Sequence, residues 1–325
     1  MKALTQAAQN PFPYSDTNRR FYTYDYYLRH TYGGKVAKIP LDAGCTCPNL
    51  DGTRGVGGCI YCSSRGSGDF APQASLTVTE QFAAGVAALS DKWKPVGYIP
   101  YFQAHTNTYA PVERLRALWE EAIAQPGVVG LAVATRADCI SPAVADLLRE
   151  FAARTRLTVE LGLQTANDRT AEVINRCHTF EEFVRGYRLL DGLDVCIHLI
   201  EGLPGESRED MLETARQVAK LRPFAVKLHL LHVLRDTALA DLWVRGEYTP
   251  MELADYVQVV CDTLELLPTD TVVERITGDG PPDLLLAPLW SRKKFVVMNE
   301  IDKELHRRDS YQGKRAGQDD PDHAE

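Results

Sequence analysis

The sequence predicts an α/β fold built around a parallel barrel, and three observations lead to this expectation. Short apolar runs alternate with amphipathic stretches of helical length over residues 96–277. Strands that are separated by such helices pair in parallel through right-handed crossovers. Polar side chains recur where the apolar runs end, which is the working face of a parallel barrel. We therefore expect a partial (β/α)6 barrel that is not fully closed, with a doubly wound open sheet as the alternative.

Each predicted element carries local signals for its type. The predicted strands are the apolar runs at residues 97–103, 130–135, 158–164, 195–200, 225–233 and 271–277. The helices between them begin with residues that suit a helix N-terminus, namely Thr79, Pro111, Ser141 followed by Pro142, and Ser207.

The chain is expected to divide into four parts. An N-terminal arm covers residues 1–40, the barrel covers 41–280, and a C-terminal extension covers 281–306. Residues 307–325 are polar, charged and nearly free of apolar side chains, so they are predicted to form a disordered tail.

Bulk composition narrows the class of protein. The 325 residues are 45% hydrophobic and 25% charged, which is ordinary for a globular protein. No apolar run is long enough to span a membrane and no signal peptide is evident, so we expect a cytoplasmic protein with no membrane contact. In that reducing compartment, eight cysteines indicate metal binding or catalysis rather than disulfides. The net charge of −8 argues against a broad nucleic-acid-coating surface.

Basic and aromatic residues are interleaved in the N-terminal arm, over residues 18–38. They are Arg19, Arg20, Arg29, His30, Lys35 and Lys38 among Phe21, Tyr22, Tyr24, Tyr26, Tyr27 and Tyr32. Such a segment could grip phosphates and stack on bases. The preferred interpretation is a helix that lays its tyrosines on the barrel.

Three cysteines, Cys47, Cys59 and Cys62, stand in the stretch CPNLDGTRGVGGCIYC and have the spacing of metal ligands. A closed structural site takes four protein ligands, so three leave a metal position open for a substrate or cosubstrate. The glycines of the loop let the backbone wrap closely around a bulky centre. The alternative is a zinc site in which Cys45 supplies the fourth ligand.

These motifs resemble the radical S-adenosylmethionine (SAM) superfamily. The C-x11-C-x2-C spacing is similar to its elongator-like subgroup of uncharacterised bacterial proteins, and the likeness runs from about Tyr26 to Asn299. Cys45 stands where that family usually has an aromatic residue. The further matching stretches are YFQAHTNTY, ATRAD, ELGLQTA, INRCH, HLIEGLPGE and LLAPLW.

The resemblance implies a [4Fe–4S] cluster held by the three cysteines, with its fourth iron chelating S-adenosyl-L-methionine. An electron from a donor of the flavodoxin or ferredoxin type would then cleave the sulfonium and give a 5′-deoxyadenosyl radical. A barrel interior that excludes water suits such chemistry.

The resemblance also implies contacts to the cosubstrate. Tyr61 matches the aromatic residue that lies against the adenine. Gln103 and Thr106 belong to the strand-end loop that meets the methionine amino group, although the usual Gly-Gly pair is missing here. Glu160 and Gln164 match the ribose and carboxylate contacts of the fourth strand.

Further matches lie later in the chain. Arg176 resembles the arginine that pairs with the methionine carboxylate. His198 and the turn from Gly202 to Glu206 match the strand that borders the adenine. Each match has a structural alternative: Gln164 could satisfy a strand end, Arg176 could form an ordinary ion pair, and His198 could be hydrogen-bonded core.

The substrate is the least defined of these expectations. The resemblance implies tRNA as a partner, with modification of a wobble uridine side chain, but we expect no acetyltransferase domain after the barrel. A small metabolite such as a tetrapyrrole or cofactor precursor is the alternative, and a zinc-stabilised binding protein is the third hypothesis. No catalytic residue is assigned. Side chains that could meet an anionic substrate at the barrel mouth are Lys227, His229, His232, Arg235, Glu274 and Arg275.

Overall fold

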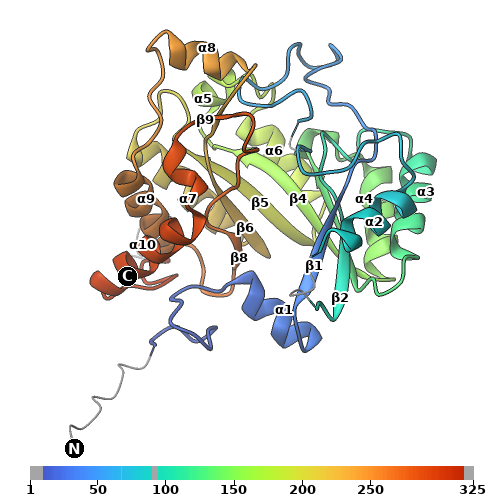
Figure 1. Cartoon of the computed structure of the whole chain (residues 1–325), viewed down its shortest axis with the longest axis horizontal. Helices are drawn as coiled ribbons and strands as arrows, with labels where there is room; N and C mark the ends of the chain where they lie inside the picture. Colours follow the sequence, from blue (N-terminus) through green and yellow to red (C-terminus); the bar gives the residue numbers. More distant parts are fainter. Residues whose placement is uncertain (1–9, 67, 90–93, 318–325) are drawn as a thin grey trace, which may run out of the picture.

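The computed structural model describes residues 10–66, 68–89 and 94–317. Within these residues, seven parallel strands form one curled sheet (Figure 1). In spatial order they are β1 (Val36–Leu41), β2 (Gly97–Phe102), β3 (Gly130–Thr135), β4 (Arg156–Gln164), β5 (Asp194–Glu201), β6 (Ala225–Leu230) and β8 (Val272–Arg275). The order follows the chain without the reversal that a doubly wound sheet requires, so the predicted partial barrel is confirmed.

The six predicted strands are all present, and β1 precedes them. Its sequence, VAKIPL, is interrupted by Lys38, so it does not read as an apolar run. Lys38 can lie inside the barrel because Glu160 and Glu274 each approach its Nζ to 2.6 Å. The barrel sheet consequently begins at Val36, within the segment assigned to the arm.

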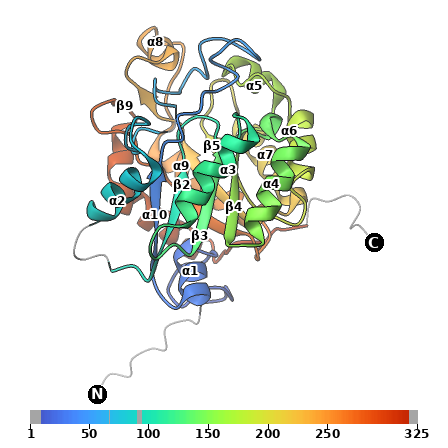
Figure 2. The same cartoon turned by 90° about the vertical axis from the view of Figure 1, so that its right-hand side faces the viewer.

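Helices cover the outer face of the sheet. Figure 2 shows α3 and α4 in front of the neighbouring strands, and serine caps begin two of the outer helices as predicted, Ser141 before α4 and Ser207 before α7. The outer helices are α2 (Val78–Ala87), α3 (Val112–Ile123), α4 (Pro142–Ala152), α5 (Asp168–Val173), α6 (Phe180–Arg188), α7 (Arg208–Leu221) and α9 (Leu253–Leu266). Helix α2 is capped by Thr77 rather than by Thr79, because Thr77 and Glu80 form a reciprocal capping box.

The smaller elements lie at the two ends of the barrel. Helix α8 (Ala238–Val244) and the antiparallel pair β7 (Val233–Leu234) and β9 (Leu285–Ala287) stand at the upper end of Figure 1, together with the cysteine loop that follows β1. Helix α10 (Lys294–Arg307) packs on α9. None of the helices in the described part of the chain combines the length and apolar composition that crossing a membrane requires.

Helix α1 (Tyr24–Tyr32) lies at the lower end of the barrel (Figure 1). Tyr27 and Leu28 are buried there in a cluster with side chains of β1, β2, β3 and β5. This confirms the interpretation of the arm as a helix with tyrosines on the barrel. Basic side chains of the arm are engaged in ion pairs: Arg19 with Asp302, Arg20 with Asp309, and Arg29 with Asp25.

The predicted disordered tail is wrong for residues 308–317, which pack against the lower end of the barrel. Gln312 is fully buried, and its Nε2 donates hydrogen bonds to the main-chain oxygens of Pro268 and Thr271. Arg308 forms an ion pair with Asp262 at 2.7 Å. Polar contacts rather than apolar burial hold this segment, so its composition was misleading. Residues 318–325 lie outside the described residues.

Candidate cofactor site

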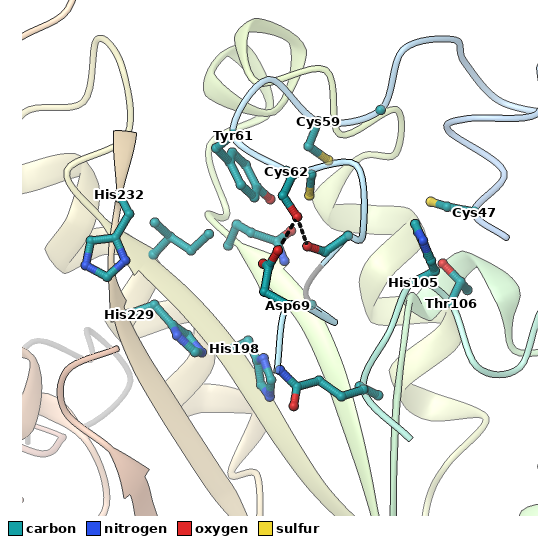
Figure 3. Close-up of a pocket in the computed structure, with 18 of the residues that line it drawn as sticks. Cys47, Cys59, Tyr61, Cys62, Asp69, His105, Thr106, His198, His229 and His232 are labelled. Atoms are coloured by element: carbon teal, nitrogen blue, oxygen red, sulfur yellow. Dashed lines mark hydrogen bonds between the residues drawn. The ribbon is translucent and has the colours of Figure 1, made fainter. Parts of the chain in front are cut away.

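A cavity of about 800 Å³ opens at the end of the barrel where the parallel strands finish. The cysteine loop forms one side of it, and the ends of the strands form the rest (Figure 3). This volume lies in the range of pockets that bind cofactors and small substrates. The cavity is therefore where the predicted chemistry has to be located.

The three predicted cluster ligands, Cys47, Cys59 and Cys62, all line this cavity (Figure 3). The loop that carries them is held from within the fold, because Asn175 Nδ2 donates to the main-chain oxygen of Gly58 at 2.7 Å and Asn49 Nδ2 donates to Cys59 Sγ at 3.7 Å. Three thiols from different positions in the loop thus face one cavity.

One of these thiols, that of Cys59, is poised to lose its proton. A hydrogen bond with Cys62 lowers the pKa of Cys59 to about 6, although burial acts in the opposite direction. The same hydrogen bond, with burial, raises the pKa of Cys62. Thiolates are the form in which cysteine binds iron or zinc, so this donor set fits a metal centre.

The zinc alternative is not supported. Cys45 is buried in the apolar core and does not line the cavity, so it is not placed to complete a four-ligand set. No group of three His, Cys, Asp or Glu side chains among the described residues is arranged to hold a single metal ion. A four-iron cluster is larger than one ion and has ligands farther apart, which fits three thiols spread around a cavity.

Seven of the nine predicted cosubstrate contacts line the cavity, and two do not. Those that do are Tyr61, Gln103, Thr106, Glu160, Gln164, Arg176 and His198. Gly202 and Glu206 instead line a separate pocket of about 380 Å³ beside α7. The turn after β5 leads these two residues away from the cysteines.

Gln164 adopts an unusual backbone conformation at the end of β4. Its φ is +64°, and the pairing with β5 shifts register between Gly162 and Gln164. A Cβ atom at Gly162 would lie 2.5 Å from Gln164 Nε2, so the glycine makes room for this side chain. Strain of this kind concentrates at functional sites.

Arg176 is held mainly by the main chain, and Asp168 also forms an ion pair with it at 3.6 Å. It is 1% exposed, and its guanidinium donates hydrogen bonds to the carbonyl oxygens of Leu163, Thr165 and His178. It therefore fixes the loop after β4. Its role as partner of the methionine carboxylate remains a prediction that would require some of these bonds to be exchanged.

Arg136 lines the cavity and was not singled out by the sequence reasoning, although the ATRAD stretch that contains it was. Its guanidinium binds both carboxylate oxygens of Asp138 at 2.8 and 2.9 Å and donates to the main-chain oxygen of Arg176 at 2.9 Å. Its positive charge also helps to lower the pKa of Cys59. The fold thus fixes the positive charge of Arg136 where it acts on one of the predicted cluster ligands.

Glu160 is the centre of a charged network on the inner face of the barrel. Burial alone would raise its pKa, but two lysines and a histidine hold that pKa well below its usual value. Four side chains from four other strands donate to its carboxylate: Lys38, Tyr101, His198 and Lys227. The predicted ribose contact therefore has its oxygens occupied by the protein, and His198 is hydrogen-bonded to it at 2.8 Å.

The predicted mouth residues separate into two groups. Lys227, His229, His232 and Arg275 line the cavity, whereas Arg235 and Glu274 are not part of its lining.

Glu201, at the end of β5, gives a pH-dependent prediction. Burial, with a smaller effect of Glu206, raises the pKa of Glu201 to about 8. Its folded pKa lies above the unfolded value, so the folded state holds the proton more tightly and stability falls as the pH rises between the two values. We expect Glu201→Gln to stabilise the protein increasingly from about pH 5 to pH 8, by up to about 1.4 kcal/mol per pH unit. Urea unfolding across this range measures it, and a constant difference would contradict the prediction.

Comparisons with known proteins agree with this geometry. The sequence model described as "Radical SAM superfamily" matches residues 52–218, and that of the "Radical_SAM C-terminal domain" matches residues 223–307. The uncharacterised protein YtqA of Bacillus subtilis (strain 168) is 49% identical over 307 residues, which is 94% of this chain and 95% of that protein.

Two further proteins match this chain at lower identity or over a smaller share of its length. A tRNA uridine(34) acetyltransferase of Methanocaldococcus jannaschii is 30% identical over 164 residues, which is 49% of this chain but 30% of that protein. The solved structure of archaeal Methanocaldococcus infernus Elp3 with an N-terminal deletion superposes with a TM-score of 0.63 at 20% identity. It covers 85% of this chain and 64% of that one. The structural likeness supports the fold, and the sequence likenesses confirm the resemblance read from the motifs.

Proposed function

The chain belongs to the radical SAM superfamily, and from this premise we propose that Cys47, Cys59 and Cys62 hold a [4Fe–4S] cluster at which S-adenosyl-L-methionine is reductively cleaved. Its family makes it an enzyme of the radical SAM class. The observation that carries the proposal is that three thiols line one cavity at the mouth of the barrel. When bound and reduced, the cluster would supply an electron that splits the sulfonium and leaves a 5′-deoxyadenosyl radical.

The residues of this chain would bind, orient and shield the reactants. Tyr61 lies in the cysteine loop and offers an aromatic face. Thr106 is 1% exposed, and the loop around it is fixed because Asn107 Nδ2 donates to the main-chain oxygens of Phe102 and Ala134. Such pre-organised groups hold a cosubstrate without reordering. Gly202 and Glu206 are not part of this proposal, because they line another pocket.

For the substrate we propose a tRNA wobble uridine side chain, with an external reductant of the flavodoxin or ferredoxin type as electron donor. The support is the likeness to the tRNA uridine(34) acetyltransferase, which covers half of this chain. A small metabolite is the second candidate. It is favoured by the net charge of −8 and by the arm, whose arginines are ion-paired at the end of the barrel opposite the cavity.

The cluster proposal is tested by anaerobic purification followed by iron, sulfide and zinc analysis. About four irons and four sulfides per chain are expected. Incubation with dithionite and S-adenosyl-L-methionine should then release 5′-deoxyadenosine. One zinc per chain without sulfide would contradict the proposal.

The tRNA proposal predicts salt-dependent binding. Phosphate contacts release counterions, so affinity for bulk tRNA should fall at least about tenfold between 50 and 200 mM salt. Filter binding measures this, with a DNA hairpin of equal charge as the control for non-specific attraction. No tRNA binding at low salt, or equal binding of the hairpin, would favour the small metabolite.

A further inference from the structure

The wall of the cavity formed by β6 and β8 carries polar groups that the proposed cosubstrate chemistry does not use. His229 lies near the end of β6, His232 follows it, and Arg275 ends β8; all three line the cavity. Figure 3 shows both imidazoles on the side of the cavity away from Cys47.

The structure gives these groups no hydrogen-bonding partner among the residues it describes. Among the residues that the structure describes, neither His229 nor His232 makes a side-chain hydrogen bond, and the Nε2 atom of each is buried. In the same part of the chain, Arg275 has no ion pair, although it is half-buried. Buried polar groups are nearly always partnered in native proteins, so such a cluster requires an explanation.

The electrostatics of the wall favour an anion. Lys38 and Lys227 are balanced by Glu160 and Glu274, whereas no carboxylate in the described ranges forms an ion pair with Arg275. Burial lowers the pKa of His232 to about 4 and that of His229 well below its usual value, so both rings are neutral at pH 7. A neutral imidazole donates one N–H without adding charge, and a guanidinium adds a fixed positive charge and paired donors.

Two carboxylates near the wall, Asp236 and Asp279, also line the cavity, but both are exposed, so solvent screens their charges. Asp279 is exposed and forms an ion pair with Lys294 at 2.8 Å. His198 is already hydrogen-bonded to Glu160. No third ligand joins the two histidines in the described residues, so they do not form a metal site.

Two glycines keep space beside the rings. A Cβ atom at Gly278 would lie 3.6 Å from His229 Nδ1, and one at Gly280 would lie 3.2 Å from His232 Nδ1. The loop after β8 therefore passes close to both rings without placing a side chain on them. Apolar side chains of Leu230, Leu231 and Leu234 line the same part of the cavity.

We propose that Arg275, His229 and His232 bind an oxyanion of the substrate, a carboxylate or a phosphate, on the side of the cavity away from Cys47. The leucines receive an uncharged part of the same molecule. The assignment to the substrate rests on the proposed function. The predicted cosubstrate contacts that line the cavity lie on the cysteine loop, in the loop after β2, on β4 and β5, and between α5 and α6, which leaves the β6–β8 wall free. The binding of an oxyanion at this wall does not depend on the proposed function.

Histidine NMR of the anaerobically purified full chain tests the proposal, with inorganic phosphate and acetate as probes. The ring signals of His229 and His232, assigned from the His229→Gln and His232→Gln variants, should shift in a saturable way with at least one probe. His30, whose Nδ1 donates to the main-chain oxygen of Tyr26 on α1 and which lies outside the cavity lining, is the internal control and should not shift. A lower dissociation constant for phosphate than for acetate identifies a phosphate site, and the reverse identifies a carboxylate site. Absence of saturable shifts with both probes overturns the proposal.

The matched variants are Arg275→Gln and Arg235→Gln, because Arg235 is an exposed arginine outside the cavity lining. Loss of a charge-assisted contact should raise the dissociation constant of the probe at least about tenfold in Arg275→Gln. Arg235→Gln should bind as the wild type does. Equal weakening in both variants would show that general charge, not this site, attracts the anion, and would overturn the proposal.

Two further measurements distinguish a failure of this proposal from a failure of the proposed function. Excess S-adenosyl-L-methionine should leave probe binding intact, whereas competition would show that the wall holds the cosubstrate carboxylate and would overturn the substrate assignment. Iron, sulfide and 5′-deoxyadenosine are measured on the same preparation. If the histidine signals shift but neither a cluster nor cleavage is found, the oxyanion site stands and the proposed function is wrong. If cleavage is found without histidine shifts, the proposed function stands and the oxyanion site is wrong.

Discussion

The Cys59→Ala variant is expected to lose both the iron–sulfur cluster and the release of 5′-deoxyadenosine. Cys59 and Cys62 form a hydrogen-bonded pair at the cavity, and Cys59 has the thiol whose pKa is lowered to about 6. Its removal leaves two protein ligands, which are too few to hold a cluster whose fourth iron would already have no protein ligand. Iron and sulfide analysis, the visible absorption spectrum and 5′-deoxyadenosine release measure the effect.

Cys45→Ala is the matched control, because this cysteine stands two positions before Cys47 but is buried in the apolar core. We expect it to keep about four irons per chain and to lose only the packing of one small side chain. Loss of the cluster in Cys45→Ala, or its retention in Cys59→Ala, would show that the ligand set is wrong. The fold of each variant is checked by circular dichroism, so that an unfolded protein is not mistaken for an empty site.

The cluster loop could be predicted because the residues that define it lie close together in the sequence. Three cysteines and the glycines between them lie within 16 consecutive residues, CPNLDGTRGVGGCIYC, and their spacing alone indicates a metal centre. The strands were predictable for a similar reason, since apolar runs buried on both faces stand out from the helices. Strand β1 was not predicted, because its lysine is neutralised by glutamates that lie 122 and 236 residues away in the chain.

The contacts inside the cavity were less predictable, because they depend on groups brought together from distant strands. The motif predicts that Arg176 pairs with the methionine carboxylate, but it did not reveal that three main-chain carbonyls also bind the guanidinium. Gly202 and Glu206 follow β5 closely in sequence, yet their turn faces a different pocket. A motif therefore identified which segments approach the site, but not which of their atoms remain available to a ligand.

Glu160→Gln is expected to destabilise the fold by about 3–5 kcal/mol, because it removes one partner from a buried ionic network. The variant keeps the size of the side chain but leaves Lys38 and Lys227 with Glu274 as their remaining counter-charge. Two cations at the inner face of the barrel would then share one carboxylate in a region with little water. Urea unfolding at pH 7 measures the loss, and Arg185→Gln, which breaks an exposed pair with Glu181, should cost less than about 1 kcal/mol.

The pH dependence separates a charge effect from a packing effect. The folded pKa of Glu160 lies well below its usual value, so its ionised form contributes stability above the unfolded pKa, about 4.3, and this contribution is lost as the pH falls toward the folded pKa. The difference between wild type and Glu160→Gln should therefore be full at pH 7 and narrow progressively below about pH 4.3. A difference that is equally large in acid would mean that the glutamine disturbs packing. A negligible difference at pH 7 would mean that the lysines are not held in the barrel by this carboxylate, and that the inner face is more open to water than the structure indicates.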